Sequence, residues 1–187
     1  MYERLYHELA WAYDPISWLV SGGRWRDWQR CALPYVIGPR VLEIGCGPGW
    51  LLLDLLEAGD RAYGCDLSPR FWRQTGHRLR RRGYPDRLIG GDARALPFPA
   101  TSFDTLVLTF PAPFVRDLQF WHEAARVLRP DGRLVIVEAA TAEPTLWPGL
   151  FERAIGRWTG VVSGQKTQFT IGGIVAERKV VETPRGH

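Results

Sequence analysis

The chain has 187 residues, of which 45% are apolar and 24% charged, as in a single globular domain with a hydrophobic core. The net charge is +4. We interpret the arginine run at residues 78–82 as the solvated end of a helix. Because no nucleic-acid-binding motif accompanies this run, nucleic acid is not an expected partner. Three cysteines without a CxxC pair exclude a disulfide framework and a zinc site, and no apolar run reaches the ~20 residues that span a bilayer, which favours a cytoplasmic protein with reduced thiols and no metal.

The first 36 residues are predicted to be helical and rich in aromatic residues. Short helices are expected over residues 2–12, 16–20 and 25–33, with breaks at Asp14-Pro15 and Gly22-Gly23 and an end at Pro34. This segment is either a mobile cover over a ligand or part of the packing of the domain.

From residue 40, predicted strands and helices alternate. The strands span residues 41–44, 62–66, 87–90, 103–109, 133–138 and 174–182, and the helices span residues 50–57, 69–82, 115–128 and 145–158. A turn is expected at residues 129–132. Because the strands are apolar on both faces, the pattern indicates an α/β fold with a doubly wound, mostly parallel sheet. We expect one domain, 1–187, with a helical N-terminal cover (1–36), a ligand-binding core (40–140) and a C-terminal helix and strand (141–187).

The stretch VLEIGCGPGW, residues 41–50, places a glycine loop between the first strand and the first helix. Such a loop lets a ligand approach the backbone closely. Dinucleotide-binding proteins use G-x-G-x-x-G, but the third glycine position holds Trp50 here, and the nearby Glu43 would repel a pyrophosphate. A dinucleotide ligand is therefore disfavoured.

The string E-I-G-C-G-P-G, residues 43–49, resembles the first motif of class I S-adenosylmethionine-dependent methyltransferases. Four later passages extend the resemblance to about residue 138: YGCDLSP, GGDARALPF, FDTLVLTF and ARVLRPDGRLVIVE, where Asp131 replaces a glycine of the family. The branch with ubiquinone and menaquinone C-methyltransferases and small-molecule or phospholipid N-methyltransferases is the most similar. The leading YERLYHELAWAYDPIS also resembles that branch.

The resemblance implies a Rossmann-like fold that binds S-adenosylmethionine and releases S-adenosylhomocysteine. It implies that Glu43 suits the amino-acid part of the cofactor, that Asp66 accepts the ribose hydroxyls, and that the Asp92–Ala93 pair reads adenine. The full set of implied cofactor-binding residues is Glu43, Gly45, Cys46, Gly47, Gly49, Asp66, Leu67, Asp92, Ala93, Thr109 and Phe110.

The acceptor is expected to be a small or lipid-like molecule. Nucleobase N-methyltransferases carry a polar residue at the end of the fourth strand where Phe110 stands, so nucleobase methylation is disfavoured. Candidate substrate-contacting residues are Tyr6, Tyr13, Trp18, Pro111 and Phe114. The residues do not identify a catalytic base. An NAD-type oxidoreductase and a non-catalytic S-adenosylmethionine-binding protein stay open as alternatives.

The C-terminal region departs from the family, whose sheet ends in an antiparallel seventh strand. Residues 174–182 fit the sixth strand, and no seventh strand follows. Either residues 168–171 supply an additional pairing segment, or an open edge pairs with another chain, which would give a homo-oligomer.

Overall fold

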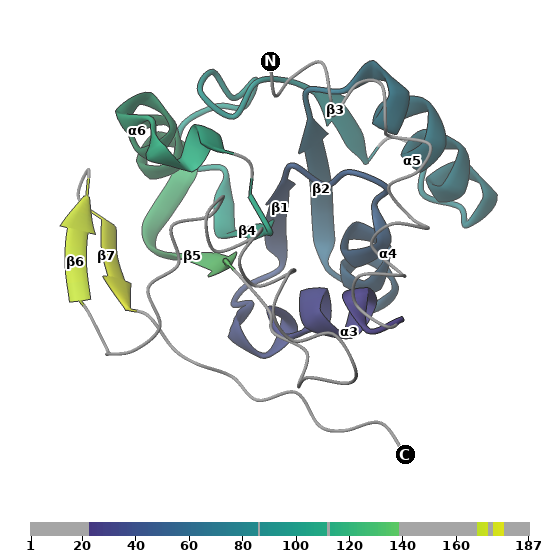
Figure 1. Ribbon diagram of the computed structural model, residues 1–187, viewed down its shortest axis with the longest axis horizontal. Coiled ribbons are helices and arrows are strands. Elements are labelled where there is room, and N and C mark those ends of the chain that lie inside the picture. The colour runs from purple at the N-terminus through teal and green to yellow at the C-terminus, as the bar shows by residue number, and fades with distance from the viewer. Residues whose placement is uncertain (1–22, 86, 112, 139–167, 172–173, 178–187) are drawn as a thin grey trace, which may run out of the picture.

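Five segments rich in apolar residues form one parallel sheet in the computed structural model (Figure 1), which describes residues 23–85, 87–111, 113–138, 168–171 and 174–177. The strands are β1 (Arg40–Ile44), β2 (Arg61–Asp66), β3 (Leu88–Gly90), β4 (Phe103–Thr109) and β5 (Leu128–Val137). Their order, β3-β2-β1-β4-β5, confirms the predicted doubly wound α/β fold. The order reverses between β1 and β4, and sheets of this kind bind ligands at that point, beyond the carboxyl ends of the strands.

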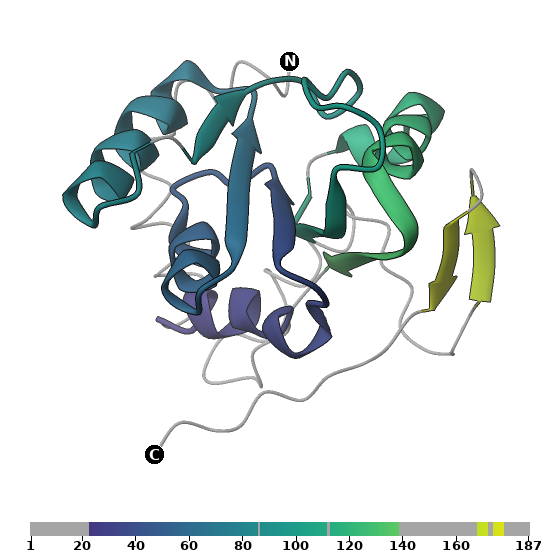
Figure 2. The ribbon, with the colours of Figure 1, turned by 180° about the vertical axis from the view of Figure 1, so that it is seen from behind.

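Helices cover both faces of the sheet, as Figures 1 and 2 show from opposite sides. One face packs on α4 (Trp50–Glu57) and α5 (Pro69–Arg81), through leucines of both helices against Val41 and Val107. The other face packs on α6 (Leu118–Val127), where Phe120 lies against Leu106. The predicted bounds of α4 are confirmed at both ends.

One helix start differs from the predictions, and another, that of α5 at Pro69, agrees with them. The helix expected from residue 115 begins at Leu118, because the Asp117 side chain accepts the Gln119 amide as an N-cap, and a short 3-10 helix, η2 (Pro113–Arg116), precedes it. Ser68 does precede α5 at the capping position, but its buried hydroxyl makes no hydrogen bond within the described residues.

Residues 129–132, which were predicted to form a turn, belong to strand β5. Phe103 pairs with Leu128 and Thr105 with Arg133, so two steps along β4 match five steps along β5. The extra residues form a bulge in which Asp131 has a φ of 65°. The prediction of a separate turn was therefore wrong, although it correctly identified where the chain leaves regular strand geometry.

The first described helix, α3 (Trp25–Arg30), ends before the predicted residue 33. Pro34 does not stop it, but lies inside a second short helix, η1 (Leu33–Tyr35), at a position that tolerates proline. Helix α3 is tied to α4 by Asp54, whose 7%-exposed side chain accepts hydrogen bonds from Arg26 (2.5 Å) and Arg30 (2.9 Å). Burial acts to raise the pKa of Asp54, but the bonds from Arg30 and Arg26 outweigh it and hold the pKa below its usual value.

We expect Asp54→Asn to lower the free energy of unfolding by about 1–2 kcal/mol, because two charge-assisted contacts are lost from partly exposed arginines. Folding lowers the pKa of Asp54, so this stabilisation is present at pH values above the ordinary aspartate pKa and is lost as the pH falls through the lowered pKa.

Urea denaturation measures the free energy of unfolding of each variant. Glu57→Gln is the control: Glu57 lies on the same helix and pairs with the exposed Arg82, so its effect should be within roughly 0.5 kcal/mol. Equal effects of both variants would contradict the claim that Asp54 stabilises the protein by linking α3 to α4.

The C-terminal strands form a separate antiparallel hairpin of β6 (Gln168–Ile171) and β7 (Ile174–Glu177). The predicted extra pairing by residues 168–171 is confirmed. The expected place of residues 174–182 in the parallel sheet is wrong for the described residues 174–177, which pair with β6. Within the described part of the chain β5 is an edge of the parallel sheet, and self-association through an open edge stays a prediction.

Several predicted features lie outside the described residues: the helices at 2–12, 16–20 and 145–158, the Asp14-Pro15 break and residues 178–182. The division of the chain into cover, core and C-terminal segment likewise stays a prediction. None of the helices in the described ranges has the length and apolar character needed to cross a membrane.

Candidate functional site

The glycine loop, residues 45–49, links β1 to α4 beside the point where the strand order reverses. Gly45, Gly47 and Gly49 have φ values of 72°, 48° and 71°, a region that favours glycine. A Cβ atom at Gly45 or Gly47 would meet nothing within 4 Å, whereas one at Gly49 would lie 2.3 Å from the Thr75 methyl carbon. The first two glycines therefore border open space, and the third allows α5 to pack closely.

The backbone amides of this loop are all engaged within the protein, and Pro48 has none. Their acceptors are the Cys65 carbonyl for Gly45 (2.7 Å) and Cys46 (3.3 Å), the Asp66 carboxylate for Gly47 (2.8 Å) and the Cys46 carbonyl for Gly49 (2.8 Å). A phosphate-binding loop aims free amides at its ligand. This loop offers none, which supports the argument against a dinucleotide.

Asp66 ends β2 and holds the glycine loop in place. One carboxylate oxygen accepts the Gly47 amide at 2.8 Å, and the other accepts the Ser68 amide at 2.8 Å. A carboxylate offers about four acceptor sites and is the kind of group that accepts hydroxyl donors such as those of a ribose. Leu67, the next residue, is 48% exposed and adds an apolar surface beside this carboxylate.

Helix α5 braces the glycine loop from the side. The Thr75 hydroxyl donates to the Gly47 carbonyl at 2.7 Å, and the Arg78 guanidinium donates to the Pro48 carbonyl. Arg78 also lies 3.6 Å from the centre of the Trp50 ring, whose surroundings include Arg26 at 5.2 Å. The interpretation of the arginine run as a solvated helix end is therefore wrong for Arg78. It holds for the exposed residues 80 and 81.

Glu43 is the buried acid of the site. It lies in β1 between Gly64 of β2 and Val107 of β4 and is 1% exposed, so it does not face solvent. Neither carboxylate oxygen has a hydrogen-bond partner among the described residues. Burial, reinforced by the charge of Asp66, raises the pKa of Glu43 well above its ordinary value, and the Leu52 backbone opposes this. The surroundings of Glu43 thus favour its protonated form, and a nearby cation would favour the ionised form.

The end of β4 carries Thr109 and Phe110, which α3 covers. Gln29 donates to the Thr109 hydroxyl at 3.1 Å, and the other amide atom of Gln29, its oxygen, is buried without a partner in the described part of the chain. Phe110 has a φ of 50°, an outlier for a bulky residue of the kind found at functional sites. Its ring lies 4.3 Å from that of Trp25. Sequence reasoning identified Thr109 and Phe110 but missed Gln29 and Trp25.

Asp92 and Ala93 follow β3, beside the end of β2. Asp92 is held by Arg94, through the guanidinium at 2.7 Å and the backbone amide at 2.9 Å. These bonds, the guanidinium first, hold the pKa of Asp92 below its usual value, so the group is ionised. Ala93 is buried. The implied cofactor residues Gly45, Gly47, Asp66 and Asp92 thus gather at the carboxyl ends of three neighbouring strands.

The candidate substrate residues are less well placed. Phe114 packs edge-on against Phe120, with ring centres 5.2 Å apart, which gives it a role in the core. Pro111 lies directly after Phe110. Tyr6, Tyr13 and Trp18 lie outside the described residues. Within the part of the chain that the structure describes, no group of three or more His, Cys, Asp or Glu residues is arranged to hold a metal ion.

The three cysteines are free thiols, of which Cys46 and Cys65 are buried and Cys31 is half-buried. Burial raises the pKa of Cys65 to about 12 and that of Cys46 well above its ordinary value.

Because the thiolate is the reactive form, we expect iodoacetamide at about pH 8 to modify Cys31 first and to spare the other two. Mass spectrometry of the native protein tests this, with urea-unfolded protein as the control in which all three react. Early labelling of Cys46 would show that the glycine loop opens.

Comparison with known proteins places this site in a family. The family profile described as a methyltransferase domain matches residues 42–136. The chain is 35% identical over 140 residues to the demethylmenaquinone methyltransferase of Tropheryma whipplei (strain Twist), covering 72% of this chain and 57% of that one. It is 31% identical over 170 residues to the demethylmenaquinone methyltransferase of Thermus thermophilus, covering 86% and 77%. The chain thus spans about 57% of the first of these relatives.

Solved structures share the fold. A structure described as an S-adenosylmethionine-dependent methyltransferase from Thermotoga maritima superposes with a TM-score of 0.58 at 22% identity, covering 71% of this chain and 59% of that chain. The PH0226 protein of Pyrococcus horikoshii OT3 superposes with a TM-score of 0.55 at 24% identity, covering 63% and 59%. Since the family profile spans half of the chain and the Thermus relative is matched over 77% of its length, the chain belongs to the class I S-adenosylmethionine-dependent methyltransferases, in the branch of the ubiquinone and menaquinone C-methyltransferases.

Proposed function

We propose that this protein binds S-adenosylmethionine at the glycine loop and transfers its methyl group to a quinone-like small molecule. The observation that carries the proposal is Glu43, a buried carboxyl group with no hydrogen-bond partner in the described residues, beneath a loop with no free amide. Such a site suits the positively charged amino group of an amino-acid moiety and not a pyrophosphate.

Each implied residue has a role that its position supports. When bound, S-adenosylmethionine supplies an electrophilic methyl group on a sulfonium. Glu43 would balance the amino group, Asp66 would accept the ribose hydroxyls, and Leu67 would lie against the adenine. Thr109 and Phe110 would form the floor under the methionine part, fixed by Gln29 and Trp25 of α3. Alignment of the reacting groups and exclusion of water are the main contributions that such residues make to methyl transfer.

The acceptor is proposed from the names of the relatives. Two of them are named demethylmenaquinone methyltransferases, and a third, from Paracoccus denitrificans (strain Pd 1222), is named a ubiquinone/menaquinone biosynthesis C-methyltransferase at 30% identity over 157 residues. Residues of the N-terminal segment (Tyr6, Tyr13 and Trp18), with Pro111 and Phe114, stay the predicted acceptor contacts. A cytoplasmic location also stays a prediction.

Calorimetry and a transfer assay test this function together. We expect S-adenosylmethionine and S-adenosylhomocysteine to bind with one-to-one stoichiometry and NAD not to bind. Radioactive methyl from S-adenosylmethionine should then appear in a short-chain demethylmenaquinol. Binding without transfer to this or related quinols would support a non-catalytic binding protein, and binding of NAD alone would revive the oxidoreductase alternative.

We further predict that Asp92→Asn weakens S-adenosylhomocysteine binding by roughly fivefold, about 1 kcal/mol, because one acceptor for the exocyclic amine of adenine is lost. Arg94→Gln is the matched control: it removes the present partner of Asp92 but leaves the carboxylate in place, so binding should be retained. Calorimetry gives both values. If Asp92→Asn and Asp92→Ala both bind as the wild type does, the adenine lies elsewhere.

A further inference from the structure

Three arginines gather at the amino-terminal edge of the sheet, opposite the glycine loop. Arg40 and Arg61 begin β1 and β2 and are direct register partners, and Arg87 immediately precedes β3. Side chains at matched positions of neighbouring parallel strands lie on the same face, about 5 Å apart. The three guanidinium groups are thus held on one face of the sheet.

No carboxylate of the described residues forms a salt bridge with any of these three guanidinium groups. The acid near Arg40 is Asp104, whose oxygens are bound to the Arg129 guanidinium at 2.9 Å and to the Arg40 backbone amide at 3.0 Å. Like charges at directly opposed positions of a sheet are destabilising. Because these arginines form no salt bridge within the described part of the chain, they give this edge a concentrated positive potential at some expense of stability.

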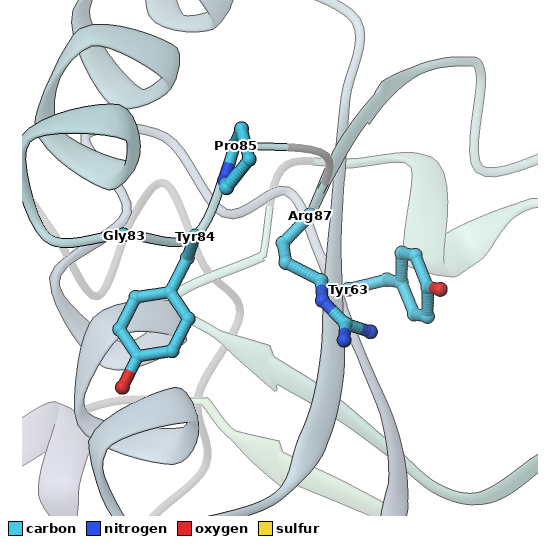
Figure 3. Close-up of a pocket in the computed structure, with 5 residues that line it drawn as sticks. All are labelled: Tyr63, Gly83, Tyr84, Pro85 and Arg87. Carbon is cyan, nitrogen blue, oxygen red and sulfur yellow. The ribbon is translucent and has the colours of Figure 1, made fainter.

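Two adjoining hollows lie around these arginines. The larger, about 410 Å³, is lined by all three arginines and by the aromatic residues Tyr63, Phe98 and Phe103. The smaller, about 340 Å³, lies on the other side of Arg87, between Tyr63 and Tyr84. Figure 3 shows Arg87 between these two tyrosines, and its guanidinium lies 4.9 Å from the centre of the Tyr63 ring. Among the described residues, the lining of both hollows contains no acidic side chain.

The floor of the larger hollow is a cluster of aromatic rings. Tyr63, Phe98 and Phe103 meet edge-to-face, with ring centres 4.9–6.5 Å apart. The chain between β3 and β4, residues 91–102, forms no helix, and helix α6 packs on the same sheet face farther along, over β5. Tyr63 and Phe98 are therefore only half-buried beside the hollow, whereas Phe103 beneath them is buried.

We propose that this hollow is a second binding site, for a small organic dianion in which a phosphate-type group is attached to a flat aromatic ring. A phosphate monoester carries close to two negative charges and several acceptor oxygens, which match the fork-shaped donors of arginine. The aromatic floor supplies stacking surface for the ring. The volume of the hollow lies within the usual range for small-molecule sites. The site is independent of the proposed methyl transfer, because it lies at the opposite edge of the sheet.

Titration calorimetry of the full chain with 1-naphthyl phosphate tests this site. We expect one-to-one binding that is weakened at least tenfold in Arg61→Gln/Arg87→Gln. The matched control, Arg80→Gln/Arg81→Gln, removes the same charge from exposed positions at the end of α5 and should stay within twofold of the wild type. Tyr63→Leu should also weaken binding while leaving the charge unchanged. Inorganic phosphate and 2-naphthol should each bind at least tenfold more weakly than the combined molecule.

The proposal would be overturned if the wild type did not bind 1-naphthyl phosphate, or if the two double variants lost equal affinity for it. It would also be overturned if inorganic phosphate bound as tightly as 1-naphthyl phosphate, or if S-adenosylhomocysteine displaced 1-naphthyl phosphate. The last result would place the probe at the glycine loop. Thermal unfolding and S-adenosylhomocysteine binding of each variant show that it is folded. Failure of the methyl-transfer assay would leave these expectations unchanged.

Discussion

Asp66→Ala is expected to weaken S-adenosylhomocysteine binding by roughly 5- to 150-fold, or about 1–3 kcal/mol, the usual effect of removing hydrogen bonds to a charged group. The carboxylate has two functions that are lost together. It accepts the Gly47 and Ser68 amides, both at 2.8 Å, and in the proposed complex it accepts the ribose hydroxyls. Calorimetry with S-adenosylhomocysteine measures the change.

Two further variants make this test specific. Asp66→Asn should bind nearly as poorly as Asp66→Ala, because its NH₂ group would face one of the two backbone amides that now donate to a carboxylate oxygen. Asp60→Asn carries the same chemical change next to the opposite end of β2 and should bind as the wild type does. Wild-type affinity in a folded Asp66→Ala protein would show that the ribose lies elsewhere.

Features set by local sequence could be predicted well. The bounds of α4 and β4 follow from apolar runs that end at glycines or at turn residues, and the structure confirms them at both ends. The positions of Asp66 and of the glycine loop follow from the order of strand, loop and helix. The rejection of a dinucleotide ligand also depended on a local feature, Trp50 in place of a glycine, and the engaged loop amides support it.

Features set by contacts between distant residues could not be predicted. Arg78 resembles its exposed neighbours in the sequence, and only the packing of α5 against the loop brings it to Trp50 and Pro48. Gln29 reaches Thr109 across 80 positions of the chain. The hairpin of β6 and β7 depends on which partner a strand selects, and an alternating pattern does not specify the partner.

These long-range contacts hold the site rigid from two sides. Helix α5 binds the carbonyls of Gly47 and Pro48, and α3 is tied to α4 through Asp54 while covering Thr109 and Phe110. The loop geometry is therefore set before a ligand arrives, which lowers the entropic cost of binding. Glu43 is the exception, because its charge state in the described structure is not the one that a bound cation would favour.

We expect the affinity for S-adenosylmethionine to rise with pH, by up to about tenfold per unit above the ordinary glutamate pKa and up to the raised pKa of Glu43, because binding displaces a proton from Glu43. Burial and the charge of Asp66 raise the pKa of Glu43 well above its ordinary value, which favours the protonated form in the free protein. A positively charged amino group brought to Glu43 favours the carboxylate and lowers that pKa. Calorimetry in two buffers of different ionisation enthalpy should therefore show proton release on binding.

Glu43→Gln separates this effect from other titrations, because it keeps the shape of the side chain and cannot ionise. The variant should bind more weakly at neutral pH and release fewer protons. At neutral pH the variant should also unfold at a higher temperature than the wild type. A carboxyl group whose pKa is raised by folding stabilises the protein fully at pH values below its pKa in the unfolded state. This contribution is lost as the pH rises toward its pKa in the folded state. If wild type and variant show the same pH slope of affinity while only their unfolding temperatures differ, Glu43 is a buried acid of the sheet and the amino group is bound by other residues.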